Sequence, residues 1–386
     1  MKRRSFLVQA TALGVGQLAL GCSSKQPIVL NVQLLQDSIP AQLLGKFRKT
    51  LQQSVKLNFE PEAQLQDLYK RLETWKRQAA EEETPQRWSI PFIGKRRSVI
   101  ASLVTLGDYW LETAIRQNLI EPLELSSLSG WQELPSRWQT LVKRNRQGEL
   151  DESGVVWGAP YRWGSTVIAY NRDKFKELGW IPKDWSDLWH PELRDRISLL
   201  DQPREVIGLT LKKLGFSYNQ TDLTQVPDLK AELLALQQQA KFYSSDRYLE
   251  PLVLGDTWVA VGWSTDILAL RGSDRQIEAV VPQSGTALWA DLWVQPASVG
   301  AKQKSVSKEW IDFCWQQQPA IDISLLTDAA SPLLTSINPT NLPNDIRENS
   351  LLLPNSSVLD KSEFLYPLPK ETLKQYETLW AEIRKT

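Results

Sequence analysis

An α/β fold with more than one domain is predicted by three features of the sequence. The chain has 386 residues, which exceeds one ordinary hydrophobic core and favours about two domains. Short apolar runs alternate with segments of helical periodicity, a rhythm typical of a mostly parallel sheet covered by helices. A polar stretch at residues 148–154 interrupts this alternation and indicates the approach to a domain boundary.

The first half of the chain contains three predicted strands, each followed by a helix. The strands are expected from apolar runs at residues 28–34, 55–59 and 99–106. Apolar side chains at helical spacing predict one helix after Pro40 and a second over Leu65–Trp75. Gly107-Asp108 is expected to cap a third helix, which runs from Tyr109 to about Leu119.

The second half repeats the pattern with more elements. Strands are expected at residues 166–170, 197–200, 258–263, 279–281 and 288–294. Helices are expected at residues 206–214, 229–240, 307–317 and 370–384.

Composition argues against several classes of function. Lys+Arg and Asp+Glu both number 45, so no global field attracts nucleic acid or a membrane face. The single histidine, His190, lies in a turn without metal-ligand spacing, and no nucleophile elbow or phosphate loop is present. We therefore expect no enzyme, no metal and no cofactor. The 17 tryptophans suit a binding protein, although most individual indoles are expected in the core.

The N-terminus resembles an export signal. Arg3-Arg4 followed by a short, weakly apolar run is similar to a twin-arginine signal, and the run is too short to span a bilayer. Ala19-Leu20-Gly21-Cys22 resembles a lipoprotein cleavage box, in which Cys22 would carry the lipid. We expect a signal at residues 1–21, a tether at 22–27 and no disulfide, because acylation would leave Cys314 alone.

The strand at residues 288–294 is the most informative local feature. Alternation places Trp289, Asp291 and Trp293 on one face, so that a carboxylate lies between two indoles. An acid inside a strand is costly if it is buried unpaired, so it needs a cation. From this strand alone, a structural salt bridge and a contact to a cationic ligand both remain open.

Two strand-to-helix connections in the second half carry further polar and aromatic residues. In open α/β sheets such connections face the ligand crevice. Glu205 follows the strand at 197–200 and is either a ligand carboxylate or an acid that complements the helix dipole. Trp263 precedes Ser264 in the same kind of connection and is expected to line the crevice, with Ser264 as a helix cap.

A series of short motifs in order resembles the spermidine/putrescine-binding family of bacterial ABC importers. The resemblance spans roughly residues 28–320 and rests on Tyr161-Arg162-Trp163-Gly164-Ser165-Thr166, Ala169-Tyr170-Asn171, Trp185-Ser186-Asp187-Leu188-Trp189, Pro191-Glu192-Leu193, Arg204-Glu205-Val206, Gly262-Trp263-Ser264, Trp289 and Asp291. It implies a two-lobed type II periplasmic binding fold with a ligand cleft between lobes joined by a hinge. The lobes would comprise residues 28–159 with 292–335 and residues 160–291 with 336–386.

The resemblance also implies the ligand contacts. In it, Asp291 grips an ammonium group, Glu205 holds a second amine, and aromatic residues sandwich the methylene chain. The positions that match are Tyr109, Glu205, Trp263, Trp289 and Asp291, with Asp37 and Gln202 at two altered points.

Three departures change one wall of this site. Asp37 keeps an acid, but the aromatic residues expected on either side of it are absent, and Gln202 stands where an acid is frequent. A late tyrosine is missing around residues 329–330. Arg162, near the hinge, would admit a ligand that carries an anionic group.

The resulting hypothesis is an exported, lipid-anchored, monomeric protein of the periplasm. It would capture a polyamine such as putrescine or spermidine and deliver it to an ABC permease in the cytoplasmic membrane. The same fold with another amine or amino-acid-derived solute is the first alternative. An anchored carboxylate-dependent enzyme and a partner protein without solute are more remote. Asp291→Ala is expected to abolish binding and to leave the fold intact.

Overall fold

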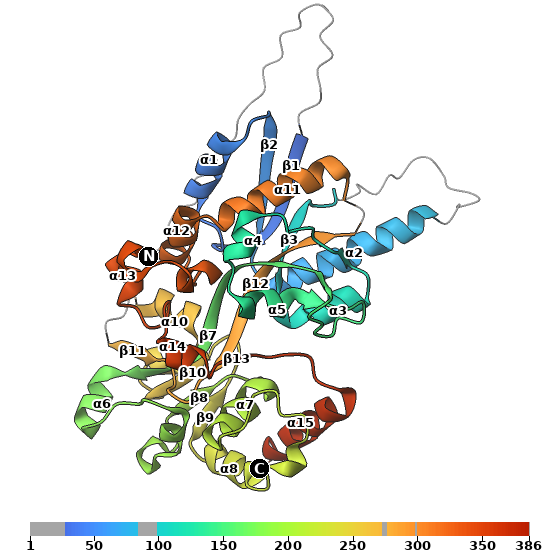
Figure 1. Cartoon of the computed structure of the whole chain (residues 1–386). Helices are drawn as coiled ribbons and strands as arrows, with labels where there is room; N and C mark the ends of the chain where they lie inside the picture. Colours follow the sequence, from blue (N-terminus) through green and yellow to red (C-terminus); the bar gives the residue numbers. More distant parts are fainter. Residues whose placement is uncertain (1–27, 84–98, 272–275, 298, 386) are drawn as a thin grey trace, which may run out of the picture.

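The computed structural model describes residues 28–83, 99–271, 276–297 and 299–385, and one mixed sheet runs through them. The strand order is β2-β1-β3-β12-β7-β10-β8-β9, with β4 and β13 paired to β12 and β11 paired to β7. Figure 1 shows this sheet as the axis of an elongated molecule, with helices gathered around each half. The α/β prediction and the two-lobed architecture are confirmed.

The first lobe begins with a regular parallel arrangement. β1 (Ile28–Leu35) pairs in parallel with β2 (Val55–Glu62) and β3 (Leu103–Gly107). The connecting helices are α1 (Ala41–Thr50) and α2 (Leu65–Glu83). Both helices place apolar residues at helical spacing against the sheet, such as Leu43 and Leu68, which are fully buried.

Two long antiparallel strands connect the lobes. β7 (Ala159–Asn171) and β12 (Ala287–Pro296) extend from one half of the molecule into the other, as Figure 1 shows. Their register shifts between Asp291 and Leu292, so that β7 carries one extra residue there. Such a β-bulge bends a strand locally and is suited to a hinge.

The second lobe is built on the far ends of these strands. β10 (Val259–Trp263) pairs antiparallel to β7 and parallel to β8 (Ile197–Leu199), and β9 (Ala240–Tyr243) forms the edge. The helices around them are α7 (Pro203–Lys213), α8 (Leu229–Gln237), α10 (Ser264–Arg271) and α15 (Lys370–Ile383). β11 (Ile277–Val280) pairs with β7.

Shorter elements complete the two lobes. The other α-helices are α3 (Leu111–Arg116), α4 (Ser129–Glu133), α5 (Ser136–Val142), α6 (Arg172–Leu178), α9 (Glu250–Val253), α11 (Ala301–Cys314), α12 (Gln317–Leu326), α13 (Asn344–Arg347) and α14 (Ser356–Leu359). The short strands are β4 (Ile120–Glu121), β5 (Lys143–Arg144), β6 (Val155–Val156) and β13 (Glu363–Phe364). The 3-10 turns are η1 (Asp108–Trp110), η2 (Trp185–Trp189), η3 (Pro191–Leu193), η4 (Leu223–Gln225), η5 (Pro332–Thr335) and η6 (Pro339–Asn341).

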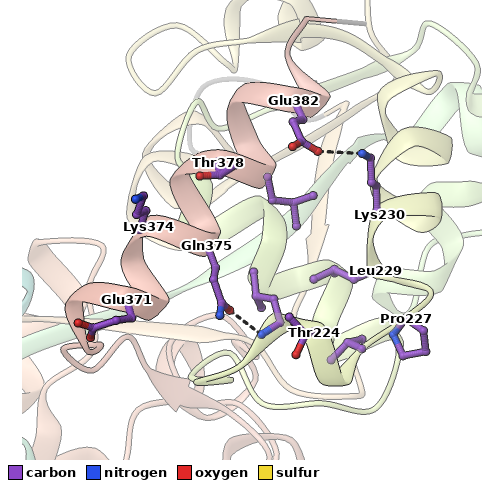
Figure 2. A pocket seen from close by; sticks show the side chains of 12 residues that line it. Thr224, Pro227, Leu229, Lys230, Glu371, Lys374, Gln375, Thr378 and Glu382 are labelled. Atoms are coloured by element: carbon purple, nitrogen blue, oxygen red, sulfur yellow. Dashed lines mark hydrogen bonds and ion pairs between the residues drawn. The ribbon is translucent and has the colours of Figure 1, made fainter.

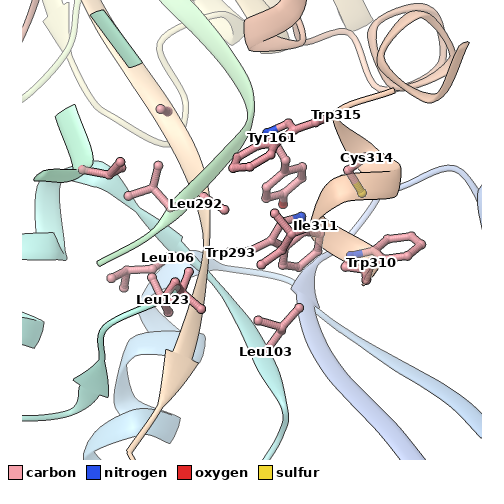
Figure 3. Packing of buried hydrophobic residues seen from close by; sticks show 14 of the residues in the cluster. Leu103, Leu106, Leu123, Tyr161, Leu292, Trp293, Trp310, Ile311, Cys314 and Trp315 are labelled. Atoms are coloured by element: carbon pink, nitrogen blue, oxygen red, sulfur yellow. The ribbon is translucent and has the colours of Figure 1, made fainter. Parts of the chain in front are cut away.

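The first lobe has an aromatic core. Tyr161 of the bulge stacks on Trp293 with ring centroids 4.1 Å apart, and its hydroxyl group lies 3.0 Å from the Ser38 and Thr105 hydroxyls. Trp310 and Cys314 of α11 pack beside this pair, as Figure 3 shows. Burial raises the pKa of the Cys314 thiol, which is 1% exposed.

Trp293 differs in its surroundings from the other residues of the predicted face. It is fully buried in the first core, although it shares that face of β12 with Trp289 and Asp291. Trp293 lies about 7 Å beyond Asp291 along the strand, where side chains of the aromatic core cover that face of β12.

Packing also locates the boundary between the lobes. The first core includes Trp163 and Leu288, whereas Ile168 and Ala287 belong to the second core. The boundary between the lobes therefore crosses β7 near its middle and β12 near its start. Residues 336–364 were expected with the second lobe, but their apolar side chains pack mainly in the first core, as Leu342, Ile346, Leu352 and Phe364 show.

Some expectations concern residues outside the described part of the chain. The signal at 1–21, the tether at 22–27 and the lipid site Cys22 all fall there. Among the residues that the structure describes, no helix combines the length and apolar character needed to cross a bilayer.

Candidate functional site

A cavity of about 480 Å³ lies between the lobes and collects most of the predicted site residues. Its walls come from the hinge strands, from the segment after β3, from the starts of α7 and α10, and from α15. The lining residues are Leu35, Leu65, Gly107, Asp108, Tyr109, Trp110, Arg162, Gln202, Pro203, Arg204, Glu205, Trp263, Thr265, Asp266, Leu288, Trp289, Ala290, Asp291, Leu365, Leu373, Tyr376 and Glu377.

Strand direction explains why these side chains meet. η1 directly follows β3, α7 follows β8 and α10 follows β10. The carboxyl ends of strands in both lobes therefore deliver their next residues to one crevice, as open α/β sheets do at ligand sites.

The Asp291 carboxylate forms a buried ion pair with Arg162. The two residues are cross-strand partners on β12 and β7, and Arg162 Nε donates to Asp291 Oδ2 at 2.5 Å. Their side chains are only 6% and 2% exposed, respectively. Burial raises the pKa of Asp291, and the adjacent guanidinium opposes that shift. Burial lowers the pKa of Arg162, but the charge and hydrogen bond of Asp291, together with Tyr161 and Asp266, outweigh it and leave that pKa above its usual value. Of the two alternatives for this acid, the structure therefore contains the salt bridge.

Glu205 presents a second carboxyl from the first turn of α7. It is 7% exposed, and Thr166 Oγ1 on β7 donates to its Oε2 at 3.0 Å. Burial raises the pKa of Glu205 to about 7, while hydrogen bonds from Thr166 and Trp263 oppose the shift. A cation beside this carboxyl would favour its ionised form.

Asp108 faces the same cavity from the first lobe. Its Oδ1 accepts the backbone N–H of Ala290 at 3.0 Å, which fixes it against β12. Burial raises its pKa to about 7, and the nearby charge of Asp291 adds to the rise. From the sequence, Asp108 is expected only as a helix cap, because an acid after a strand-ending glycine is typical of a cap.

Aromatic side chains form the remaining walls. Trp289 lies directly over Gly164 of β7, where an added Cβ would come within 2.3 Å of the indole ring. Trp263 lies at the end of β10, edge-on to Tyr248 at 6.0 Å. Trp110 stacks on Tyr69 at 5.7 Å, whereas Tyr109 is 68% exposed at the rim. The indole faces can pack against methylenes and attract a cation.

Two further predicted residues have different positions. Gln202 is the exposed N-cap residue of α7 and lines the cavity. Asp37 has a left-handed backbone with φ of 59°, is exposed, and is not among the lining residues. The segment that contains Asp37 contributes Leu35 to the cavity instead.

A second hollow of about 520 Å³ lies on the surface of the second lobe between α15 and the segment around α8. Figure 2 shows that Lys230 and Glu382 pair across it, and Lys230 Nζ lies 2.8 Å from Glu382 Oε2. Gln375 accepts the backbone N–H of Leu223 at 2.9 Å. Its two acids and two bases leave no net charge for a ligand. The interlobe cavity is therefore the better candidate site.

The fold and the interlobe cavity define a solute-binding protein, and comparison with known proteins agrees. The family model described as bacterial extracellular solute-binding protein matches residues 99–357, so the chain belongs to this family. Among curated relatives, the putrescine/cadaverine-binding protein of Pseudomonas aeruginosa is 28% identical over 250 residues, covering 61% of this chain and 70% of that protein. The spermidine/putrescine-binding periplasmic protein of Salmonella typhimurium is 24% identical over 358 residues, covering 91% of each.

Solved structures support the fold. The spermidine/putrescine ABC transporter substrate-binding protein of Streptococcus pneumoniae superposes with a TM-score of 0.76 at 20% identity, covering 93% of this chain and 99% of that chain. The lipoprotein Tp0655 of Treponema pallidum has a TM-score of 0.66 at 17% identity, covering 93% of this chain and 100% of that chain. The two-lobed binding fold is thus shared over nearly the full length.

Proposed function

We propose that this protein is the solute-binding component of an ABC importer and captures a polyamine-like cation in the interlobe cavity. The observation that carries the proposal is the charge of the cavity walls. Five carboxyl groups face two guanidinium groups among the lining residues, which favours a positively charged solute.

The chemistry of the walls suits an amine with a methylene chain. Charge-assisted hydrogen bonds from an ammonium group to a carboxylate contribute about 1.5–3 kcal/mol each. Indole faces contribute about 0.5–2 kcal/mol each to a nearby cation. The cavity offers both, with Glu205 beside Trp263 in the second lobe and Asp108 beside Trp289 and Ala290 in the first.

The cellular setting follows from the same proposal. We place the mature protein in the periplasm as a monomer, tethered through a lipid on Cys22, where it passes its solute to a permease. The names of the curated relatives from Salmonella typhimurium and Escherichia coli support the location and the class of solute. Catalysis has no part in the proposal, because the family is one of solute-binding proteins.

A different amine or an amino-acid-derived solute is the second candidate. The observation that favours it is the Arg162–Asp291 pair, which neutralises the acid assigned to one ammonium group.

Calorimetry on the purified protein tests capture directly. Putrescine, cadaverine, spermidine and a panel of amino acids would be titrated into the parent and into Glu205→Gln. We expect at least one amine to bind at micromolar concentration or below, and Glu205→Gln to weaken it at least tenfold. Glu192→Gln, on an exposed turn of the second lobe, is the matched control and should bind like the parent. Absence of heat with every amine would reject the proposed solute class.

A further inference from the structure

We infer that Arg162 selects a solute with one ammonium group and an oxygen acceptor at its other end over an α,ω-diamine. The inference rests on the proposed capture of an amine in the interlobe cavity and narrows the chemical class of that solute. The acceptor is a carboxylate, as in an ω-amino acid, or an amide carbonyl, as in a diamine acylated at one end.

Arg162 already occupies the position beside Asp291 that an ammonium group of the solute would take. Its guanidinium contacts Asp291 at 2.5 Å, on adjacent strands in paired register, and both residues line the cavity. The pair is built into the hinge, because Arg162 on β7 and Asp291 on β12 face each other in register immediately beside the bulge. A solute ammonium group at Asp291 would have to displace or adjoin this fixed positive charge.

The Nη groups of Arg162 are available to a solute as hydrogen-bond donors. A guanidinium group has five N–H donors and no acceptor. In the part of the chain that the structure describes, only Nε makes a hydrogen bond, and neither Nη atom is among the buried atoms that lack a partner. The Nη groups therefore keep accessible surface next to a cavity that the residue lines. A solute oxygen can accept from them, often in a bidentate way, whereas an ammonium group has no lone pair to offer.

We place the ammonium group of the solute at the opposite wall of the cavity, beside Glu205. Glu205 is buried on α7, and Thr166 is its hydrogen-bond partner, so no arginine or lysine neutralises it within 4 Å in the described residues. Trp263 adjoins it and supplies an indole face. Arg204 also lines the cavity and interacts with Glu205 at longer range, and Asp266 lies near enough to Arg162 for their charges to interact. The Glu205 wall thus offers a carboxylate without an ion-pair partner among the described residues, and the Arg162 wall offers N–H donors, so a solute with an ammonium group at one end and an acceptor at the other fits both.

Four solutes of similar length separate these chemistries in calorimetry on the purified protein. 5-aminopentanoate carries a carboxylate, N-acetylputrescine an amide, cadaverine a second ammonium group and pentylamine no polar second end. We expect one of the first two to bind at least tenfold tighter than both cadaverine and pentylamine. Tighter binding of 5-aminopentanoate identifies a carboxylate as the acceptor, and tighter binding of N-acetylputrescine identifies an amide.

Arg162→Met tests the selecting residue, because it removes the charge and keeps most of the side-chain length. We expect the ratio of cadaverine affinity to acceptor-solute affinity to rise at least tenfold. Arg172→Met removes the same charge from an exposed site in the second lobe and should leave the ratio unchanged. Arg162→Lys keeps a cation and should retain much of the parent preference. The panel on the parent protein decides the preference even if Arg162→Met does not fold.

Two outcomes overturn the inference in distinguishable ways. Cadaverine binding at least as tightly as both acceptor solutes, with a ratio that Arg162→Met leaves unchanged, rejects the role of Arg162 and leaves amine capture intact. No binding of any of the four solutes, together with none of the polyamines, rejects the proposed function itself.

Discussion

Asp108 and Glu205 are largely buried carboxyls that face one cavity from opposite lobes. Burial raises the pKa of each to about 7, so both change charge near neutral pH. Each ionised carboxylate accepts hydrogen bonds from the protein, and neither forms an ion pair within the described residues, where Arg144 and Arg204 act on them only at longer range. Both groups are therefore poised to lose a proton when a cation arrives.

The raised pKa values of Asp108 and Glu205 predict how binding depends on pH. We expect the affinity for a cationic solute to rise from pH 5.5 to 8, by up to about tenfold per pH unit for each group that must ionise. Calorimetry in two buffers of different ionisation enthalpy would count the protons released. Glu205→Gln should flatten the profile. A flat profile in the parent would contradict the raised pKa values of both groups.

The free energy of unfolding without solute should decrease as pH rises, opposite to the trend expected for binding affinity. The folded-state pKa values lie above the unfolded values near 4, so the folded protein binds more protons between about pH 4 and 7. This contribution is fully present below the unfolded pKa and is lost as pH rises through 7. The free energy of unfolding from urea titrations should therefore decrease over this window, and less steeply in Glu205→Gln.

The Arg162–Asp291 pair changes what a substitution at Asp291 tests. Asp291→Ala would leave the Arg162 charge buried without a partner, which costs about 3–5 kcal/mol in the free energy of unfolding. The earlier expectation of an intact fold in this variant does not agree with that pairing. Replacing both partners, Arg162→Met with Asp291→Leu, should be nearly neutral or stabilising. Urea denaturation of the two proteins checks the difference, and a loss below about 1 kcal/mol in Asp291→Ala would speak against a tight pair.

The hinge strand β7 supports the aromatic wall through one glycine. At Gly164 an added Cβ would meet the Trp289 ring at 2.3 Å and the Ser264 hydroxyl at 2.5 Å. Gly164→Ala should displace the indole, lower the free energy of unfolding by about 1–3 kcal/mol and weaken solute binding. Gly45→Ala in α1, where nothing lies within 4 Å, is the control and should be neutral or slightly stabilising. Equal behaviour of the two variants would show that Trp289 does not need close contact with β7.

Most strands and helices could be predicted from the sequence because their apolar patterns are strong. The predicted strands at 28–34 and 55–59 agree closely with β1 and β2, and the predicted helix at 370–384 agrees with α15. The helix expected at 307–317 begins inside α11 and extends past its end at Cys314, and α12 was not predicted. β9 was not predicted, and the helix expected at 229–240 overlaps it only at Ala240.

The site was harder to predict than the elements. Residues in strand-to-helix connections, such as Trp263 at the end of β10 and Glu205 at the start of α7, could be assigned because strand ends converge on a crevice. The partner of Asp291 could not, because it depends on the cross-strand register of β7 and β12, which includes a bulge. Asp37 was assigned from its neighbours in sequence, but its left-handed turn leaves it outside the cavity lining.

The arrangement of two cores around two shared strands favours closure by bending. Each lobe has its own core, and β7 and β12 pass from one to the other. A solute that contacts both lobes should favour a closed form, so small-angle scattering should give a smaller radius of gyration with saturating solute. The thermal midpoint should rise as well, in line with about 2.7 kcal/mol at a hundredfold excess over Kd. Glu205→Gln at the same concentration is the control. A radius unchanged by a solute that binds would argue against closure.

The sealed position of Cys314 bears on how such movement could be followed. The sequence has two cysteines, and Cys314 is 1% exposed within the first core, with burial raising the pKa of its thiol. The thiolate is the nucleophile that attacks thiol reagents, so this cysteine should not react in the folded protein. With Cys22 replaced, a single cysteine introduced at the cavity rim, for example in place of Tyr109, would take a fluorophore selectively. The protein would then serve as an optical sensor that reports its own solute.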